Sequence, residues 1–321
     1  MSSGGTVLVL AGRFDPTADL VVEELNRRAV PVFRADLAGF PQELVLDATM
    51  GPSGWRGTLR SRSRTLCLEA VRSVYYRRPA RPRVAEGMPG AARAVAAAEA
   101  RRGFGGLLLS LPCRWLPPPG PAADAEYKPL QLRLAAEAGL SVPRTLITND
   151  PEAAARFSGT LDGPLLYKPF SQVRGTVDGR TAAVYASLVP PGMLPHPDIG
   201  TTAHLFQEWV PKAYDVRLTA VAEKLFGAEI HTTSESGHVD WRRDYASHTY
   251  RICTPPPEVV RGVHRLLERL ALPYGAFDFV VTPEGSWRFL EVNPSGQFGF
   301  VEQATGLPIT AAIADYLEAE K

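Results

Sequence analysis

The stretch FLEVNPSGQ at residues 289–297 decides the fold and the chemistry expected of this chain. It follows a polar turn, PEGS at residues 283–286, and continues an aromatic-rich segment. A turn between two apolar runs predicts a β-hairpin, whose first strand is AFDFVV at residues 276–281. In that strand Asp278 points to one side, and its two phenylalanine neighbours point to the other.

Three hard oxygen donors are expected to meet on this hairpin. Glu291 and Asn293 are two residues apart in an extended strand, so they share one face. If the strands pair, Asp278, Glu291 and Asn293 converge, and carboxylate and amide oxygens are the ligands that Mg²⁺ prefers. The alternative is a solvated hairpin with its polar residues outward. We favour the metal site, because these polar residues alternate with Phe, Leu and Val and end in Asn-Pro-Ser-Gly.

Composition limits the classes of protein to consider. A chain of 321 residues with 45% apolar and 21% charged residues is an ordinary globular protein of two or three domains. The net charge of +1 argues against nucleic acid or an anionic membrane as the main partner. Three scattered cysteines without metal spacing fit a reduced, cytoplasmic location. The sequence predicts neither a signal peptide nor a transmembrane helix.

The first third of the chain predicts an α/β domain. Residues 6–36 alternate strand, helix and strand, which favours a parallel sheet, and no G-x-G-x-x-G follows the first strand. Arg77 and Arg78 end a predicted strand at 74–79, where they could bind an acidic ligand or form a solvated strand end. Further strands are expected at 55–59 and 65–68 and a helix at 91–102, before a proline-rich break at 117–121.

The remainder predicts an α+β arrangement. Lys168 lies in an expected strand at 164–170, and a polar, glycine-containing loop at 171–179 is expected to be mobile. The other expected elements are helices at 123–138, 149–159, 255–272 and 306–320, and strands at 142–147, 205–211, 214–221 and 225–230, with a polar stretch at 231–247.

Two lysines suggest a nucleotide site. Lys128 lies on a helix after the proline break, and Lys168 precedes the polar loop. Each by itself would be an ordinary surface lysine, but together with a carboxylate hairpin they suggest a nucleotide held from both sides. The chain contains no G-x-x-x-x-G-K-[ST] and none of the protein-kinase motifs, which excludes a P-loop and a kinase.

One set of motifs occurs in this order: EYK from Glu126, LYKP from Leu166, QEWV from Gln207, DVR from Asp215, Asp278 and EVNP from Glu291. This order resembles the ATP-grasp superfamily over about 200 residues.

A second set is YYRRP from Tyr75, EYKPLQLRLA from Glu126, VPRTLITN from Val142, DWR from Asp240 and EVNPSGQ from Glu291. This set resembles, over nearly the whole chain, the ATP-grasp ribosomal peptide maturases, which are similar to the macrocyclases of microviridin-type peptides and are also called graspetide synthetases. Phe298 stands where that family leads us to expect Trp.

The resemblance implies a fold and a division of the chain. An N-terminal pre-ATP-grasp α/β domain would span residues 1–118. A central ATP-grasp lobe would span 119–205, and a C-terminal lobe with the metal site would span 206–321. The two lobes would hold ATP between them.

The resemblance also implies an activity. The chain would bind ATP and Mg²⁺ and act on a ribosomally made precursor peptide with a leader and a core. It would activate Asp or Glu side chains as acylphosphates and form esters to Thr or Ser, or amides to Lys, releasing ADP and phosphate. The resemblance also implies a homodimer, and it places leader docking at residues 220–250.

The site residues follow by motif. Lys128 and Lys168 would contact ATP phosphates or the adenine side, and Asp278, Glu291 and Asn293 would hold Mg²⁺. The segment comprising Gln207, Glu208, Trp209 and Val210 would border the nucleotide at the lobe hinge, with Glu208 and the Val210 backbone at adenine and ribose.

Two arginines are candidates for catalytic binding of phosphate or of the substrate carboxylate, because a planar guanidinium suits bidentate recognition of oxyanions. These are Arg217 and Arg242. A structural role is the alternative, with Arg217 paired to Asp215 and Arg242 paired to Asp240. Asp215 could hold the ribose or position Arg217.

Two other functions stay open at the level of sequence. An ATP-grasp ligase that joins an amino acid or small amine to a carboxylate would need the same Mg-ATP site. A non-catalytic nucleotide-binding or peptide-docking protein is disfavoured, because both metal carboxylates and both lysines are present.

Overall fold

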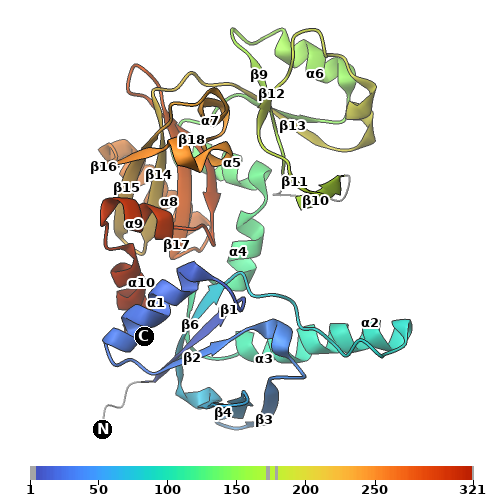
Figure 1. Ribbon diagram of the computed structural model, residues 1–321, viewed down its shortest axis with the longest axis vertical. Coiled ribbons are helices and arrows are strands. Elements are labelled where there is room, and N and C mark those ends of the chain that lie inside the picture. Colours follow the sequence, from blue (N-terminus) through green and yellow to red (C-terminus); the bar gives the residue numbers. More distant parts are fainter. Residues whose placement is uncertain (1–4, 171–173, 178–179, 320–321) are drawn as a thin grey trace.

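The computed structural model describes residues 5–170, 174–177 and 180–319, and it confirms the predicted mixture of α/β and α+β structure. Figure 1 shows an N-terminal part at one end of the molecule and two further parts at the other, joined through helix α4. The division at 118 and 205 stays a prediction.

The N-terminal part is built on a parallel sheet with strand order β2-β1-β6-β7. Its central strand, β1 (Thr6–Ala11), is almost wholly buried, which suits a parallel strand covered on both faces. Helix α1 (Pro16–Arg27) begins at Pro16, because Asp15 caps it by accepting from the Ala18 backbone N–H and proline is tolerated in the first turn. The other strands of the sheet are β2 (Val32–Ala35), β6 (Val71–Arg77) and β7 (Arg114–Leu116).

A separate antiparallel meander, β3-β4-β5, accompanies this sheet. Two of its strands, β4 (Gly54–Arg60) and β5 (Thr65–Cys67), confirm predicted strands, whereas β3 (Val45–Gly51) was not predicted. The predicted helix after residue 90 is confirmed as α2 (Gly90–Glu99), which runs through a π-turn at Ala100–Phe104 into α3 (Gly105–Leu109).

The helix predicted at 123–138 is in fact two helices, α4 (Pro119–Ala125) and α5 (Lys128–Glu137). Proline disfavours helical backbone in the residue before it and lacks an N–H, so Pro129 fits only the first turn of a new helix. The break therefore places Lys128 at the start of α5 rather than in the middle of a longer helix.

The central sheet has the strand order β12-β9-β13-β8. It contains β8 (Thr145–Thr148), β9 (Leu165–Lys168), β12 (Ser187–Leu188) and β13 (His204–Glu208), with α6 (Pro151–Ser158) packed beside it. The loop predicted at 171–179 is wrong for residues 174–177. These form β10 (Arg174–Val177), which pairs with β11 (Arg180–Ala183), whereas residues 171–173 and 178–179 lie outside the described residues.

The C-terminal sheet is antiparallel, with the strand order β16-β15-β14-β17-β18. Helices α5 and α8 (Pro257–Arg269) pack on its apolar face, where Phe277, Phe279 and Phe289 lie. The strands are β14 (Tyr214–Val221), β15 (Lys224–His231), β16 (Thr249–Cys253), β17 (Tyr274–Val281) and β18 (Trp287–Asn293). The polar stretch before β16 forms α7 (Glu235–Val239) and two short 3₁₀ turns, Trp241–Arg243 and Tyr245–Ser247.

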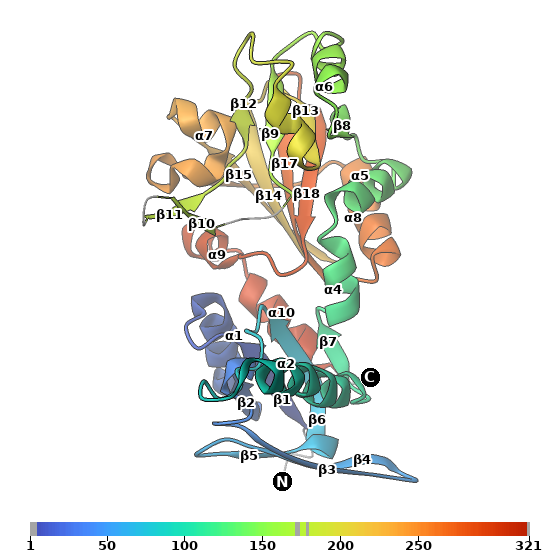
Figure 2. The same ribbon diagram turned by 90° about the vertical axis from the view of Figure 1, so that its right-hand side faces the viewer.

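The C-terminal end of the chain packs against the N-terminal part. Helix α9 (Gly299–Thr305), which was not predicted, leads into α10 (Ile309–Glu318), and Figures 1 and 2 place α10 beside α1. Arg28, which directly follows α1, pairs with Asp315 and Glu318, and the Ser73 hydroxyl donates to the Leu317 carbonyl at 2.7 Å. These contacts bind the N-terminal sheet to the part that carries the predicted metal hairpin.

Among the described residues, none of the helices has both the length and the apolar character needed to cross a membrane.

Candidate active site

The hairpin of β17 and β18 forms as predicted, and its acidic residues lie directly opposite each other. Asp278 pairs in register with Glu291, and Ala276 pairs with Asn293. The register then shifts, because the next residue of β17, Phe279, pairs with Phe289. This irregularity at Leu290 turns Phe289 into the apolar core while Glu291, two residues later, faces the site. Bulges of this kind often re-aim side chains beside active sites.

Glu291 is buried and is held by two cations. Lys128 at the start of α5 forms an ion pair with it, and Arg242 donates to its Oε1 at 2.9 Å. Arg242 also binds Asp240 through Nε at 2.9 Å and through its other amino group at 3.2 Å. Burial by itself would raise the pKa of Glu291, but Lys128 and Arg242 outweigh it and hold that pKa well below the usual range. Glu291 is therefore a carboxylate at neutral pH.

Asp278 has a different cation. Arg217 donates to its Oδ1 at 2.8 Å, and the Arg217 guanidinium lies over the rings of Trp241 and Phe300, at 5.4 Å and 5.8 Å from the two centroids. The expected alternative pairing of Arg217 with Asp215 is thus wrong, because Arg217 and Asp278 are register partners on adjacent strands. Burial raises the pKa of Asp278 even though Arg217 acts against it.

Asn293 completes the set of donors on the hairpin, with its amide nitrogen 3.5 Å from the second oxygen of Asp278. The alternative pairing considered for Arg242, with Asp240, does occur. Arg242 reaches Glu291 as well, so the pairing with Asp240 orients Arg242 toward the hairpin rather than removing it from the site.

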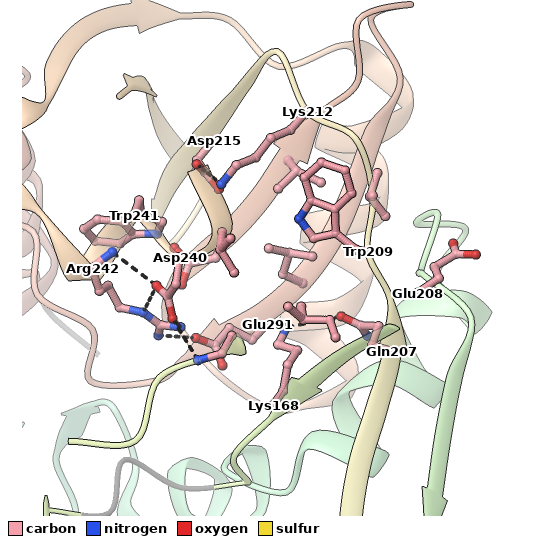
Figure 3. A pocket seen from close by; sticks show the side chains of 17 residues that line it. Lys168, Gln207, Glu208, Trp209, Lys212, Asp215, Asp240, Trp241, Arg242 and Glu291 are labelled. Atoms are coloured by element: carbon pink, nitrogen blue, oxygen red, sulfur yellow. Dashed lines mark hydrogen bonds and ion pairs between the residues drawn. The ribbon is translucent and has the colours of Figure 1, made fainter. Parts of the chain in front are cut away.

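The opposite wall of the site belongs to the central sheet (Figure 3). Lys168 of β9 is buried, and its ammonium donates to the Gln207 side chain on β13 at 3.2 Å. Gln207 in turn donates to the Thr145 hydroxyl at 2.9 Å. Burial lowers the pKa of Lys168 to about 8, and the nearby Glu291 carboxylate offsets this only in part because Lys128 and Arg242 act against it. Lys168 is therefore a desolvated cation suited to an anionic ligand.

The segment after β13 lines a pocket next to Lys168. Trp209 and Val210 border this pocket together with Gln207 and Glu208. The Glu208 carboxylate pairs with Arg288 at 2.6 Å, and Figure 3 shows Glu208 apart from the other labelled side chains. The four residues expected at the hinge thus line one pocket, and the Glu208 side chain is tied to the C-terminal sheet through Arg288.

Sequence reasoning missed one member of this pocket, Lys212. Its ammonium lies 2.6 Å from Asp215, and both side chains are about 95% buried. Burial raises the pKa of Asp215 to about 6, and Lys212 limits the rise. The signal in the sequence is weak, because Lys212 and Asp215 are three residues apart in a segment whose burial cannot be read from its polar composition.

Two cavities lie between the central and C-terminal sheets and share part of their lining. The narrower one holds about 50 Å³ and lies beside Trp209, Lys212 and Asp215. The wider one holds about 820 Å³ and reaches Tyr127, Lys128, Asn293 and the N-terminal domain at Arg78. Both are bordered by Lys168, Ala186, Asp240, Arg242 and Glu291.

The donors on the hairpin suit a hard divalent cation. In the part of the chain that the structure describes, no group of three or more His, Cys, Asp and Glu side chains could hold a metal by itself. Asp278, Glu291 and Asn293 instead offer two carboxylates and one amide, all oxygen donors. Mg²⁺ is commonly bound by one or two carboxylates together with water and substrate phosphates. The residues present therefore fit Mg²⁺ that arrives with a phosphate ligand.

Comparisons with known proteins give the class and then the family. A family model described as the MvdD pre-ATP grasp domain matches residues 6–120. The macrocyclase MdnB from Microcystis aeruginosa MRC superposes with a TM-score of 0.81 at 30% identity, covering 98% of this chain and 99% of that one. The chain belongs to the family of ATP-grasp macrocyclases that modify ribosomal peptides, and its enzyme class is ATP-grasp ligase.

Two further structures extend the likeness. Macrocyclase MdnC from the same organism, bound with precursor peptide MdnA, has a TM-score of 0.85 at 29% identity over 97% of this chain and 99% of that one. A RiPP-associated ATP-grasp ligase from Chryseobacterium gregarium, in complex with ADP and a leader and core peptide, has a TM-score of 0.89 at 25% identity, covering 98% and 96%. A search of curated proteins found no match.

Proposed function

We propose that this chain uses ATP to close side-chain rings in a ribosomally made precursor peptide. The observation that carries the proposal is the match to the macrocyclase MdnB over nearly the whole of both chains. The peptide and ADP bound to the similar proteins support a peptide substrate and a nucleotide site. The wide cavity supports the same conclusion, because it is large enough for a peptide segment and borders the Lys128, Lys168 and Glu291 side chains.

ATP would lie with its base in the narrow pocket beside Trp209, Val210 and Asp215, and its phosphates would run toward Lys168 and Lys128. Lys168 gains most from this arrangement, because a phosphate would supply the negative charge that it lacks. Asp278, Glu291 and Asn293 would hold Mg²⁺, which neutralises phosphate charge when bound.

The cations already in the site prepare it for phosphoryl transfer. A carboxylate oxygen of an Asp or Glu side chain of the peptide attacks the γ-phosphorus, the bond to the β–γ bridging oxygen breaks, and ADP leaves. A Thr or Ser hydroxyl, or a Lys amine, then attacks the acyl carbon, loses its proton to solvent and expels phosphate. Arg242 and Arg217 stabilise charge during the first step, since two anions must approach each other.

The direct test is mass spectrometry of the products. Incubation of the protein with ATP, Mg²⁺ and the precursor peptide encoded next to its gene should remove one water for each ring formed. An unchanged mass with an intact leader would contradict macrocyclisation. A gain in mass equal to an added amino acid or amine would instead identify a ligase that joins a second molecule.

The finer parts of the assignment rest on the family resemblance. We retain the division into residues 1–118, 119–205 and 206–321, leader docking along residues 220–250, and a cytoplasmic homodimer. Sedimentation of the purified protein at micromolar concentration measures the oligomeric state, and a monomer would contradict the homodimer.

A further inference from the structure

The double arginine at the end of β6 has two members with different surroundings. Arg77 is 2% exposed, and its guanidinium donates to the carbonyls of Ser295 at 2.6 Å and Gly296 at 3.3 Å. It also lies 3.4 Å from the Asp15 carboxylate. Arg77 therefore fastens the N-terminal sheet to the loop that follows the metal hairpin, and the expected solvated strand end is wrong for this residue.

Arg78 faces the cavity instead. It is exposed, and it borders the same space of about 820 Å³ as Lys128, Glu291 and Asn293. Arg78 forms no ion pair among the residues that the structure describes, and Glu126, which borders the same cavity, acts on its charge only at longer range. Of the other cations that border this cavity, Lys128 and Arg242 are paired with Glu291, whereas Lys168 contacts only the neutral side chain of Gln207 and is assigned above to the nucleotide phosphates.

The backbone at Arg78 is unusual for an arginine. Its φ of 43° lies in the left-handed region, which costs a side chain other than glycine about 1–2 kcal/mol. A glycine or asparagine would adopt this conformation more easily. Local folding preference therefore does not explain why arginine stands here, whereas a role for its side chain in the cavity does.

The position of Arg78 in the sheet is one where ligands commonly bind. The chain passes from β1 to β2 on one side of the parallel sheet and later places β6 on the other side of β1. The strand order therefore reverses between β1 and β6. Ligands of open α/β sheets bind outside the carboxyl ends of the strands at such a switch point. Arg78 is the first residue beyond the carboxyl end of β6.

We propose that Arg78 binds the acidic side chain of the precursor peptide that is to be phosphorylated. A guanidinium can grip a carboxylate with two parallel hydrogen bonds and so orient it. The N-terminal domain would then hold the acceptor carboxylate, while the central and C-terminal sheets hold the nucleotide. This inference rests on the proposed function and assigns the residue that selects the substrate's acid.

The test uses Arg78→Asn, which removes the guanidinium and suits the left-handed backbone, and Arg78→Lys, which keeps a charge without the planar fork. Affinity for the full-length precursor peptide is measured by fluorescence anisotropy with ADP and Mg²⁺ present. Loss of a charge-assisted contact should weaken the affinity for the precursor by about 10- to 100-fold in Arg78→Asn. In Arg78→Lys part of that affinity should be recovered. Arg81→Asn, at an exposed position, is the matched control and should leave the affinity for the precursor unchanged.

A second peptide makes the test specific. In a precursor whose core Asp and Glu residues are replaced by Asn and Gln, wild type and Arg78→Asn should bind with equal affinity. ADP affinity should stay within about twofold of wild type in all variants, which also shows that they are folded.

Equal affinity of wild type and Arg78→Asn for the unmodified precursor would overturn the inference, as would a matching loss with the amide precursor or a large loss of ADP affinity. If wild type binds the precursor but closes no rings, the proposed function fails and the assignment of Arg78 is judged by binding alone.

Discussion

The two sheets that face each other across the cavity treat their charges differently. On the C-terminal sheet, Asp278 and Glu291 are each neutralised by at least one cation, and Arg242 is shared with Asp240. On the central sheet, Lys168 is buried against the neutral side chain of Gln207. One wall is a set of charges already satisfied by the protein, and the other holds a charge that the protein leaves unsatisfied.

The difference indicates what each wall does when a nucleotide enters. Paired carboxylates and cations are held in position before any ligand arrives, which favours electrostatic catalysis. A desolvated lysine, in contrast, gains stability only when an anion reaches it. We therefore expect the C-terminal wall to govern turnover and the central wall to govern nucleotide affinity.

The largest expected effect comes from Glu291→Gln, which removes a buried carboxylate from the C-terminal wall. Lys128 and Arg242 lose their shared partner, and the proposed Mg²⁺ ligand is lost. We expect ring formation, followed by mass spectrometry, to fall by about 100- to 1,000-fold or more. Glu284→Gln, on the exposed turn of the same hairpin, is the control and should retain full activity. Product formation by Glu291→Gln at the wild-type rate would refute the metal role.

A second prediction concerns stability and the buried pair of Lys212 and Asp215 at the start of β14, the central strand of the C-terminal sheet. Lys212→Met leaves the Asp215 carboxylate buried without its cation, which should cost about 3–5 kcal/mol in the free energy of unfolding. Urea titration at pH 7.5 measures this loss. The double variant Lys212→Met with Asp215→Leu removes both charges and should recover most of it.

The pH dependence of that loss follows from Asp215. Its pKa of about 6 in the folded protein lies above the value of 3.8 that it has without burial, so the folded state binds the proton more tightly and lowering the pH favours it. Removing Lys212 raises this pKa further. The destabilisation of Lys212→Met should therefore shrink between pH 7.5 and pH 5, and a constant difference would contradict the assignment.

The smallest expected effect is a change in the protonation of Lys168, on the central wall, when ADP binds. Because the pKa of Lys168 is about 8, ADP binding at pH 8.5 should draw a proton onto its amine, and affinity should fall as the pH rises through that value. Calorimetry in buffers of different ionisation enthalpy measures the uptake. Lys168→Arg should abolish the pH dependence while keeping affinity within about tenfold. If Lys168→Arg takes up as many protons on ADP binding as wild type, the proton binds to a group other than Lys168.

How far the site could be predicted depends on how local each feature is. The hairpin, the shared face of Glu291 and Asn293, and the capped helix α6 follow from alternation, turns and caps within a few residues. The residues of the hinge and the two lysines were named by their order along the chain. The partner of Arg217 was not predictable, because Asp278 reaches it through a strand pairing across 61 residues of sequence.

The sequence by itself predicted that the carboxylates of the hairpin and two lysines belong to one site. Strand alternation fixes which side chains share a face, and the order of the motifs along the chain associates the two lysines with the hairpin. Only the tertiary structure decided how those charges are distributed. The bulge at Leu290 re-aims Glu291, and the end of β6 at Arg77 leaves that residue buried while Arg78, the next residue, is exposed. Register and burial depend on contacts between distant segments, and the free energy of a charge depends on both.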